Sequence, residues 1–348
     1  MALEAKSAML IALLALIVAG GAFAQRVGDT YTLDGQTYTV QSVSGNTVTL
    51  VKVEQRGDGP VNWVAVTDSA ITGIINGVAW GNNTWVAVGE TGRIAYSSDG
   101  RSWTAVANPP SGRWNGVAFG NNMFVAVGNG GVIAYSTDGR TWTAATSNLS
   151  NIINGIAFGG GRFVAVANAG RTAYSTDGRT WTAVDATGAF GNDTVRAVAF
   201  GNNRFVAVGN NSKTAYSSNG ASWTAVDASS AITTNIAING IAFSGNRFVA
   251  GGVGGRIGYS SDGASWTGVT SANNPLQSGA GGTIQDFAFG NNRWVAVGSN
   301  GRIAYSTDGT SWTAVANTTF TNVIQAVAYG NGRFVAVGNG GRMAYCDW

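Results

Sequence analysis

The 348-residue sequence predicts an all-β fold, a seven-bladed β-propeller. Three observations predict it: a repeat of about 40 residues, four short strand-like runs in each copy, and a spare strand-like run before the first copy. An aromatic residue closes the first run of every copy. These markers, spaced 39, 39, 42, 43, 46 and 40 residues apart, are Trp80, Phe119, Phe158, Phe200, Phe243, Phe289 and Tyr329. A period of this size with four strands per copy is typical of a propeller blade.

The copy that best preserves the repeat shows the expected order of elements within a blade. Its runs cover residues 285–289, 294–298, 302–306 and 311–315, and each is rich in aromatic and β-branched residues. Gly-Asn-Asn-Arg, Ser-Asn-Gly and Ser-Thr-Asp-Gly separate the runs, and Asn and Gly tolerate the positive φ of tight turns. The second run is apolar throughout, which indicates a strand buried on both faces. Each copy is therefore predicted to be an antiparallel four-stranded sheet between two others.

The ring is expected to close through a strand from the other end of the repeat region. The seventh copy ends at Trp348 without a fourth run, whereas residues 62–66 match the fourth run of the other copies. Closure removes exposed sheet edges, so the upstream run should complete the last blade. The residues predicted to do this are Trp63, Val64 and Val66.

A Ser-x-Asp-Gly-x-x-Trp segment recurs at the turn before the fourth run. It resembles the Asp-box of the bacterial-neuraminidase repeat families, which implies a propeller fold and a structural role for the acidic residue. The residues at the acidic position are Asp99, Asp138, Asp177, Asn219, Asp262 and Asp308. We expect their side chains to accept hydrogen bonds from turn amides, with calcium binding at these turns as the alternative.

The same resemblance raises a remote alternative, a carbohydrate-active enzyme. A sialidase would need a tyrosine nucleophile with a glutamate partner. Glu90 is the only glutamate within the repeats, and their tyrosines are repeat positions. The chain also has no histidine and a single cysteine, Cys346, which excludes histidine-based catalysis, histidine metal sites and an intrachain disulfide. We therefore predict no catalytic residue, no metal, no cofactor and no enzyme activity.

The net charge of +3 is carried mainly by arginines spread around the repeats. They occur before the second run and at the start of the third, at 162, 204, 247, 293 and 333 and at 93, 171, 256, 302 and 342. Such a distribution favours stacking on aromatic rings or pairing with turn acids over a continuous track for nucleic acid. No nucleic-acid partner is predicted.

Residues 8–24 form an uncharged apolar run of 17 residues, about 25 Å long as a helix. One interpretation is a secretory signal peptide cleaved after Ala24. The other is a retained helix, because residues 5–21 resemble the N-terminal helix of type IV pilins, especially the archaeal kind. That resemblance implies assembly into a filament through a helical core. The residues that would carry assembly are Leu10, Ile11, Leu13, Leu14, Leu16, Ile17 and Val18.

The chain is thus divided into a hydrophobic helix (1–25), a three-stranded meander (26–56), a linker (57–60) and the propeller (61–348). The longer blade-to-blade connections, 107–113, 185–194, 227–238 and 270–283, should lie on the rim opposite the tight turns. Variable loops on a rigid scaffold commonly bind ligands. Possible glycosylation sites are Asn82, Asn148, Asn192, Asn210 and Asn317.

These observations favour a structural subunit of an extracellular, cell-surface filament. It would polymerise with itself, contact the membrane only before assembly, and display the propeller for adhesion to cell-surface glycans or proteins. The alternative is a soluble propeller, secreted or periplasmic, that serves as a binding scaffold.

Overall fold

The computed structural model describes residues 30–33, 36–44, 47–53, 62–277, 282–316 and 318–348. The chain divides into two compact units, Met1–Pro60 and Val61–Trp348. In the first unit, β1 (Thr30–Leu33), β2 (Gln36–Ser44) and β3 (Thr47–Val53) form the predicted antiparallel meander. The proposed assembly residues, 10–18, lie outside the described residues.

The second unit contains seven antiparallel sheets of four strands each, which confirms the predicted seven-bladed propeller. The inner strands are β5 (Ile75–Gly81), β9 (Trp114–Gly120), β13 (Ile153–Gly159), β17 (Val195–Gly201), β21 (Ile238–Ser244), β25 (Ile284–Gly290) and β29 (Ile324–Gly330). The second strands are β6 (Thr84–Gly89), β10 (Met123–Gly128), β14 (Arg162–Ala167), β18 (Arg204–Gly209), β22 (Arg247–Gly252), β26 (Arg293–Gly298) and β30 (Arg333–Gly338).

The third strands are β7 (Ile94–Ser97), β11 (Ile133–Ser136), β15 (Arg171–Ser175), β19 (Lys213–Ser217), β23 (Ile257–Ser260), β27 (Ile303–Ser306) and β31 (Met343–Asp347). The outer strands are β8 (Thr104–Ala105), β12 (Thr143–Ala145), β16 (Thr182–Asp185), β20 (Thr224–Asp227), β24 (Thr267–Gly268), β28 (Thr313–Ala314) and β4 (Val64–Ala65). Several outer strands are shorter than predicted: β28 covers only part of the expected 311–315, because the preceding turn continues to residue 311 and the strand begins at Thr313.

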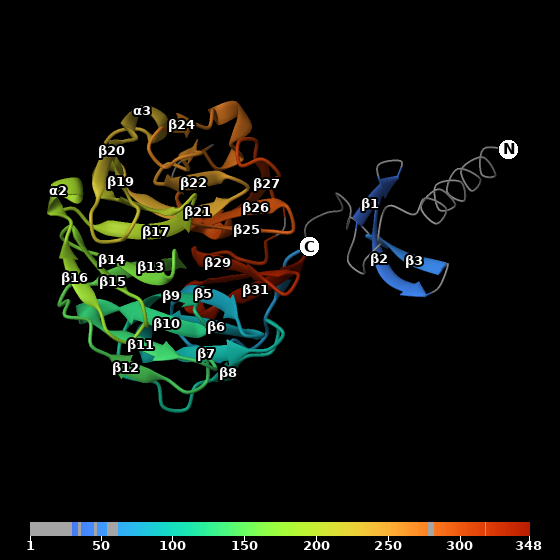
Figure 1. Ribbon diagram of the computed structural model, residues 1–348, viewed down its shortest axis with the longest axis horizontal. Coiled ribbons are helices and arrows are strands. Elements are labelled where there is room, and N and C mark those ends of the chain that lie inside the picture. Colours follow the sequence, from blue (N-terminus) through green and yellow to red (C-terminus); the bar gives the residue numbers. More distant parts are fainter. Residues whose placement is uncertain (1–29, 34–35, 45–46, 54–61, 278–281, 317) are drawn as a thin grey trace. The chain divides into compact units, whose positions relative to one another are not determined.

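The last blade is completed by the strand predicted to close the ring. Its order is β29-β30-β31-β4, with Val64 opposite Tyr345. The backbone N–H of Val66 adds a hydrogen bond of 2.9 Å to the carbonyl of Met343, and Trp63 is buried. Figure 1 shows the closed ring, in which the dark red strands of the last blade lie beside the cyan strands of the first blade.

Neighbouring blades interlock through a glycine and an aromatic ring. A Cβ atom built on Gly120 would lie 2.0 Å from Cγ of Phe158 in the next blade, so only glycine fits there. Phe158 also lies 4.7 Å from Phe163 of its own second strand, between ring centroids. The same glycine contact with the next blade is made by Gly81, Gly159, Gly201, Gly290 and Gly330. This contact explains why six of the seven first runs end in an aromatic residue followed by glycine; the fifth has Ser244 after Phe243.

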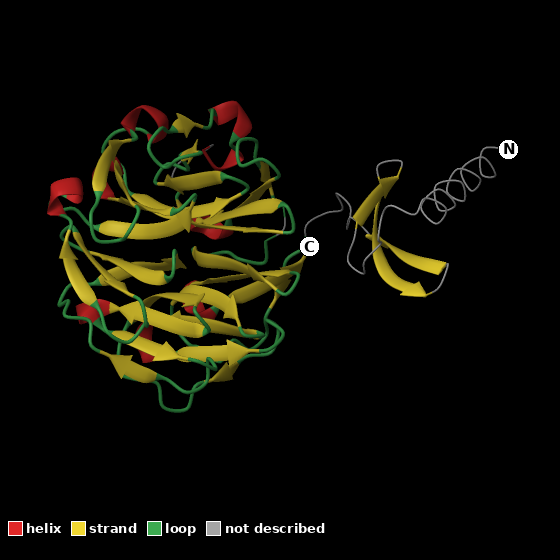
Figure 2. Ribbon diagram, in the orientation of Figure 1, coloured by secondary structure: helices red, strands yellow, loops and turns green. Residues whose placement is uncertain are grey.

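Two short helices, α2 (Thr187–Phe190) and α3 (Ser229–Ile232), lie in blade-to-blade connections at the periphery of the propeller (Figure 2). The 3-10 turns are η1 (Glu90–Gly92), η2 (Asn129–Gly131), η3 (Asn210–Ser212), η4 (Ser271–Asn273), η5 (Pro275–Gln277), η6 (Ser299–Gly301) and η7 (Asn339–Gly341). Within the part of the chain that the structure describes, none of the helices has the length and apolar character needed to cross a membrane.

Candidate functional site: the mouth of the central channel

Every inner strand carries a β-bulge at its second residue. In the first blade Ile75 pairs with Gly89 and Gly77 pairs with Val88, so that Asn76 between them has no partner in the register. A bulge redirects a side chain, and bulges are common beside functional sites. The bulged residues of the seven blades are Asn76, Asn115, Asn154, Arg196, Asn239, Gln285 and Gln325. All of them are polar, and all line the central channel.

The bulged asparagines join each blade to the next. Nδ2 of Asn115 donates a 2.8 Å hydrogen bond to the carbonyl of Ile153, the first residue of the next inner strand. Asn76, Asn154 and Asn239 donate in the same way at 2.8, 2.8 and 2.9 Å. These bonds fix the inner ends of the blades relative to one another.

A second set of bonds connects the bulged residues to the turns between second and third strands. Nδ2 of Asn154 lies 2.9 Å from Oδ1 of Asn168, and Nε of Arg196 lies 2.6 Å from Oδ1 of Asn210. In each pair the partner lies 14 residues further along the chain. The backbone of the same turns is bonded to the blade-to-blade connections, as Asn210 N is to Thr194 O at 2.9 Å. The channel mouth, these turns and the connections therefore share one side of the propeller, which we call the connection face.

The orientation of the asparagine amides follows from these partners. A backbone carbonyl only accepts hydrogen bonds, so the atom of Asn115 that contacts Ile153 must be the donor Nδ2. The Oδ1 atoms of Asn76, Asn115, Asn154 and Asn239 then accept no hydrogen bond from the described residues. The mouth of the channel consequently presents several amide oxygens to which no described residue donates a hydrogen bond.

The cavity at this mouth has a volume of about 420 Å³. It is polar, since the bulged residues from all seven blades line it together with small residues such as Gly77 and Gly116. A cavity of this size lies at the lower end of the range for small-molecule sites. Two residues, Asp286 and Arg196, carry the charge among the described residues that line it.

Asp286 occupies the position after the bulge, where other blades have glycine or alanine. Its Oδ2 accepts a 3.0 Å hydrogen bond from the backbone N–H of Val327 in the next blade. Burial raises the pKa of Asp286 to about 7, because the hydrogen bonds from Val327 and Phe287 offset only part of the cost of desolvating the carboxylate. The side chain therefore gains and loses its proton near neutral pH.

Arg196 stands at the bulge position of the fourth blade, where four other blades have asparagine. It is partly buried, and this burial lowers the pKa of Arg196, although a guanidinium remains charged at neutral pH. Its Nε is bonded to Asn210, so the terminal nitrogens remain as donors. The channel thus contains one fixed positive charge and one titrating negative charge.

The turns that contain the repeated Asp-Gly or Asn-Gly pair lie on the other side of the propeller, which we call the turn face. Oδ1 of Asp177 accepts hydrogen bonds from the backbone N–H groups of Arg179 and Thr180 at 2.9 and 2.8 Å. Asn219 accepts the same two bonds in the fourth blade, from residues 221 and 222. Asp99, Asp138, Asp262 and Asp308 repeat this arrangement. In the described residues these side chains therefore bind turn amides, and no group of three or more acidic, cysteine or histidine residues is placed to hold a metal.

Hydrogen bonding also governs the ionisation of the turn acids. Partial burial alone would raise the pKa of Asp308, but donors from Ser311, Thr310 and Ser306 outweigh it and lower the pKa to about 2. The pKa of Asp177 is likewise lowered, because hydrogen bonds from Thr180, Arg179 and Ser175 outweigh the effect of burial. These acids are charged at neutral pH and stabilise the turns.

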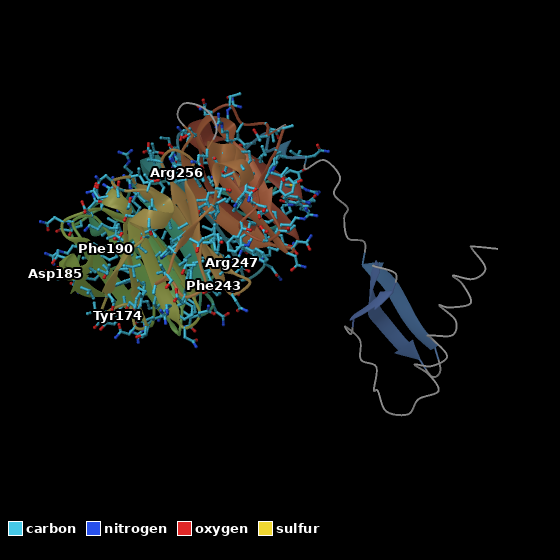
Figure 3. The ribbon with its side chains drawn as sticks, turned by 90° about the horizontal axis from the view of Figure 1, so that it is seen from above. Tyr174, Asp185, Phe190, Phe243, Arg247 and Arg256 are labelled. Atoms are coloured by element: carbon cyan, nitrogen blue, oxygen red, sulfur yellow. The ribbon has the colours of Figure 1, made fainter. Side chains whose placement is uncertain are left out.

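The arginines of the turn face stack on the tyrosines of the third strands. Arg204 lies 4.8 Å from the ring centroid of Tyr216, and its Nη1 donates a 2.8 Å hydrogen bond to the carbonyl of Asp262 in the next blade. Tyr174 of the third blade and Arg247 of the fifth, both labelled in Figure 3, belong to the same set. The arginines are thus used in contacts within and between blades, as their distribution in the sequence indicated.

The predicted glycosylation sites differ in accessibility. Asn82, Asn148 and Asn192 are exposed, although Nδ2 of Asn82 and of Asn148 donates to a backbone carbonyl. Asn210 is half-buried and bonded to Arg196, and Asn317 lies outside the described residues.

Binding is predicted from the sequence at the blade-to-blade connections, and the channel residues on the same face are not among the predicted site residues. A signal was present: the residue four places before each marker aromatic is always polar, as in Asn76 before Trp80 and Arg196 before Phe200. In a strand that otherwise reads as buried, a polar residue at a fixed position of the repeat indicates a shared polar environment. The bulge that turns these residues into the channel could not be recognised from spacing alone.

No family model and no curated protein sequence matches the chain. Solved structures of propellers do match. The structure of YCF48 bound to D1 peptide is 19% identical, covers 83% of this chain and 97% of its own, and has a TM-score of 0.63. A catalytically inactive virginiamycin B lyase from Staphylococcus aureus with Quinupristin is 11% identical over 83% of this chain and 99% of its own, with a TM-score of 0.68. The WD40 β-propeller domain of Doa1 is 11% identical over 82% and 97%, with a TM-score of 0.64. At these identities the likeness establishes the fold, which binding proteins and enzymes share.

Proposed function

We propose that the propeller is a binding module that holds its ligand at the connection face, over the mouth of the central channel. The observation that carries this proposal is the ring of polar residues on seven bulges, with Oδ1 acceptors at Asn76, Asn115, Asn154 and Asn239 that the described residues leave unused. The hydrogen bonds that join each blade to the next use only the Nδ2 donors of these side chains and leave the Oδ1 atoms for a ligand. Two of the similar propellers, YCF48 and virginiamycin B lyase, were also solved with a ligand, a peptide and Quinupristin respectively.

The blade-to-blade connections on the same face, at the periphery of the propeller, fit this role. Residues 185–194 and 227–238 differ in length and sequence, contain α2 and α3, and are anchored at Phe190 and Ile232, which are fully buried. Anchored connections on a rigid ring present their exposed residues in a fixed arrangement, which reduces the entropy lost on binding.

A screen for ligands followed by hydrogen exchange tests this proposal. Peptides, glycans and small polar molecules would be screened with the full chain by thermal shift, and each ligand found would be mapped by hydrogen-exchange mass spectrometry. We expect slower exchange in residues 185–194 and 227–238 and no change at the turn-face hairpin 201–204. Protection confined to the turn face, or no ligand that protects the connection face, would contradict the proposal.

The apolar run at residues 8–24 supports a second proposal, that the chain polymerises and displays the propeller on an extracellular pilin-like filament. Leu10, Ile11, Leu13, Leu14, Leu16, Ile17 and Val18 would form the filament core. Negative-stain electron microscopy of the native material tests it. Leu13→Asp should abolish filaments while the propeller stays folded, and intact filaments from this variant would rule the proposal out. Isolated discs from unmodified protein would instead favour the secreted or periplasmic scaffold.

A further inference from the structure

The two charged residues of the channel are departures from an otherwise regular repeat. At the bulge position of the fourth blade Arg196 replaces the asparagine of blades one, two, three and five. At the next position of the sixth blade Asp286 replaces a residue that is glycine or alanine in all other blades. A ring of identical blades needs neither substitution for its packing, and both residues line the same cavity.

The Asp286 substitution also carries a structural cost. In the fifth blade a Cβ atom on Gly240 would lie 2.6 Å from the carbonyl oxygen of Gln285 and 2.8 Å from Cα of Asp286, so this position approaches the next inner strand closely. A side chain here must fit between two blades, where Asp286 is partly buried. The partial loss of water raises the pKa of Asp286 to about 7. A charge placed at such a cost, in a cavity, is a reason to expect a ligand.

The opposite charges do not neutralise each other directly. Nε of Arg196 is bonded to Asn210, and Oδ2 of Asp286 is bonded to the backbone of Val327. The structure records no ion pair between these two described residues, which belong to the fourth and sixth blades. Each therefore has hydrogen-bonding capacity left for another partner.

We infer that the channel mouth binds a zwitterionic ligand, with its carboxylate on Arg196 and its ammonium group between Asp286 and the amide oxygens of the bulged asparagines. The inference rests on the proposed binding function and names the ligand class for that site. An ammonium group has three donors and no acceptor, which matches a surface of unused acceptors. A guanidinium matches a carboxylate, with which it can form two parallel hydrogen bonds. A cavity of about 420 Å³ accommodates a free amino acid or a short peptide.

Binding of the ammonium group should be linked to proton release. A neighbouring positive charge favours the ionised carboxylate, so the ligand lowers the pKa of Asp286 from its raised value. Near pH 7 a fraction of a proton is then released for each ligand bound. Arg196, the other charged residue lining the cavity, stays protonated throughout this range and does not contribute to the release.

The probes for a test are ω-amino acids from glycine to 8-aminooctanoate, with the alkylamine and the carboxylate of each length as controls. The chain length that binds most tightly reports the separation of the two charged sites. Isothermal titration of the full chain should give a Kd for that zwitterion at least about tenfold below those of its two controls. Repeating the titration in buffers of different ionisation enthalpy measures the proton release.

Two variants restore the residues of the other blades and should therefore fold. Arg196→Asn should weaken binding of the zwitterion and of the carboxylate about tenfold or more, and it should leave binding of the amine unchanged. Asp286→Gly should weaken binding of the zwitterion and of the amine and should remove the proton release. If the glycine variant is unstable, Asp286→Asn is used in its place, because its side chain keeps an acceptor for the backbone N–H of Val327. Thermal melts verify folding.

Equal binding of the zwitterion and its controls, or an unchanged Kd in both variants, would overturn the inference. So would the absence of binding by every ω-amino acid. The broader proposal fails separately, because it requires only that some ligand protect the connection face in hydrogen exchange.

Discussion

The guanidinium of Arg140 lies 5.2 Å from the ring centroid of Tyr96 in the preceding blade. In blades three to seven the tyrosine of the third strand is covered by an arginine at the start of the second strand of the same blade, as Tyr174 is by Arg162. The first two blades have Thr84 and Met123 at that position, and an arginine from the Asp-Gly turn of the next blade covers the tyrosine instead. Every blade thus has an arginine on its third-strand tyrosine, and Tyr345 of the seventh blade has one from each place, Arg333 and Arg101.

Arg140→Ala should lower the free energy of unfolding by about 0.5–1 kcal/mol, the range for a cation–π contact at an exposed site. Urea denaturation would measure it. Combining the change with Tyr96→Leu should cost less than the sum of the two single effects, since both remove one contact. Arg93→Ala is the matched control, because Arg93 is exposed and none of the described residues forms a hydrogen bond, ion pair or ring contact with its side chain. Equal losses from Arg93 and Arg140 would contradict a specific role for the stacking.

Gly120→Ala should destabilise the propeller by about 1–3 kcal/mol or more, because the added methyl group meets the Phe158 ring at 2.0 Å. Thermal unfolding would show the loss as a lower Tm. The control is Gly188→Ala in α2, where a Cβ atom meets nothing within 4 Å. This second change should be neutral or slightly stabilising. Similar losses from both variants would show that the interblade contact is not the cause.

Asp177→Ala should cost about 0.5–2 kcal/mol through the loss of two turn hydrogen bonds, whereas Asp177→Asn should cost less. Asn219 already performs this role in the fourth blade. Chemical denaturation at pH 7 distinguishes the two substitutions. If asparagine were as damaging as alanine, the charge and not the geometry of the acceptor would be essential.

The lowered pKa values of the turn acids also predict acid sensitivity. A carboxyl whose pKa is lower in the folded state contributes stability above its unfolded pKa, about 3.9, and this is lost as the pH falls through the folded value. For Asp308 the window runs from about 4 to about 2. Asp308→Asn should therefore flatten the fall in stability over that window, measured by denaturation at a series of pH values. An unchanged slope would contradict the link.

Asp286 predicts the opposite dependence. Its pKa is raised in the folded state, so the folded protein holds the proton more tightly, and stability falls as the pH rises from about 4 to about 7. Asp286→Asn should gain stability relative to the unmodified protein above pH 7, by up to about 4 kcal/mol for a shift of this size. The difference should shrink as the pH approaches 4. A constant difference across this range would show that Asp286 does not titrate as proposed.

Ring closure can be tested by changing where the chain starts. A chain that begins at Val61 keeps β4 and should remain a folded monomer. A chain that begins at Asp68 loses Trp63 and leaves the edge of β31 unpaired, so we expect a lower Tm and aggregation. Size-exclusion chromatography and thermal unfolding compare the two. Equal stability of both chains would show that β4 contributes little to closure.

The fold was predictable from the sequence because each part of the repeat has a local cause. Aromatic and β-branched runs give the strands, Asn-Asn and Asp-Gly give the turns, and the run that contains Trp63 supplies the missing strand. The position of the channel residues depends on longer-range contacts. Asn115 is held by a carbonyl 38 residues away, and its bulge arises from pairing that no local motif records. The charges at Arg196 and Asp286 were visible as departures from the repeat, but their common cavity depends on the closed ring.

The pairing of β4 with β31 has a consequence for the engineering of this chain. Because the polypeptide enters and leaves the ring within one sheet, the two ends of the ring are hydrogen-bonded neighbours. A short peptide joining Trp348 to Val61 would make the ring covalently continuous, and the chain could then be reopened elsewhere. The hairpin at Gly160 and Gly161 is a suitable place, since it is a tight turn between β13 and β14 on the turn face. The contacts between neighbouring blades in the closed ring determine the fold. The blade at which the polypeptide begins does not.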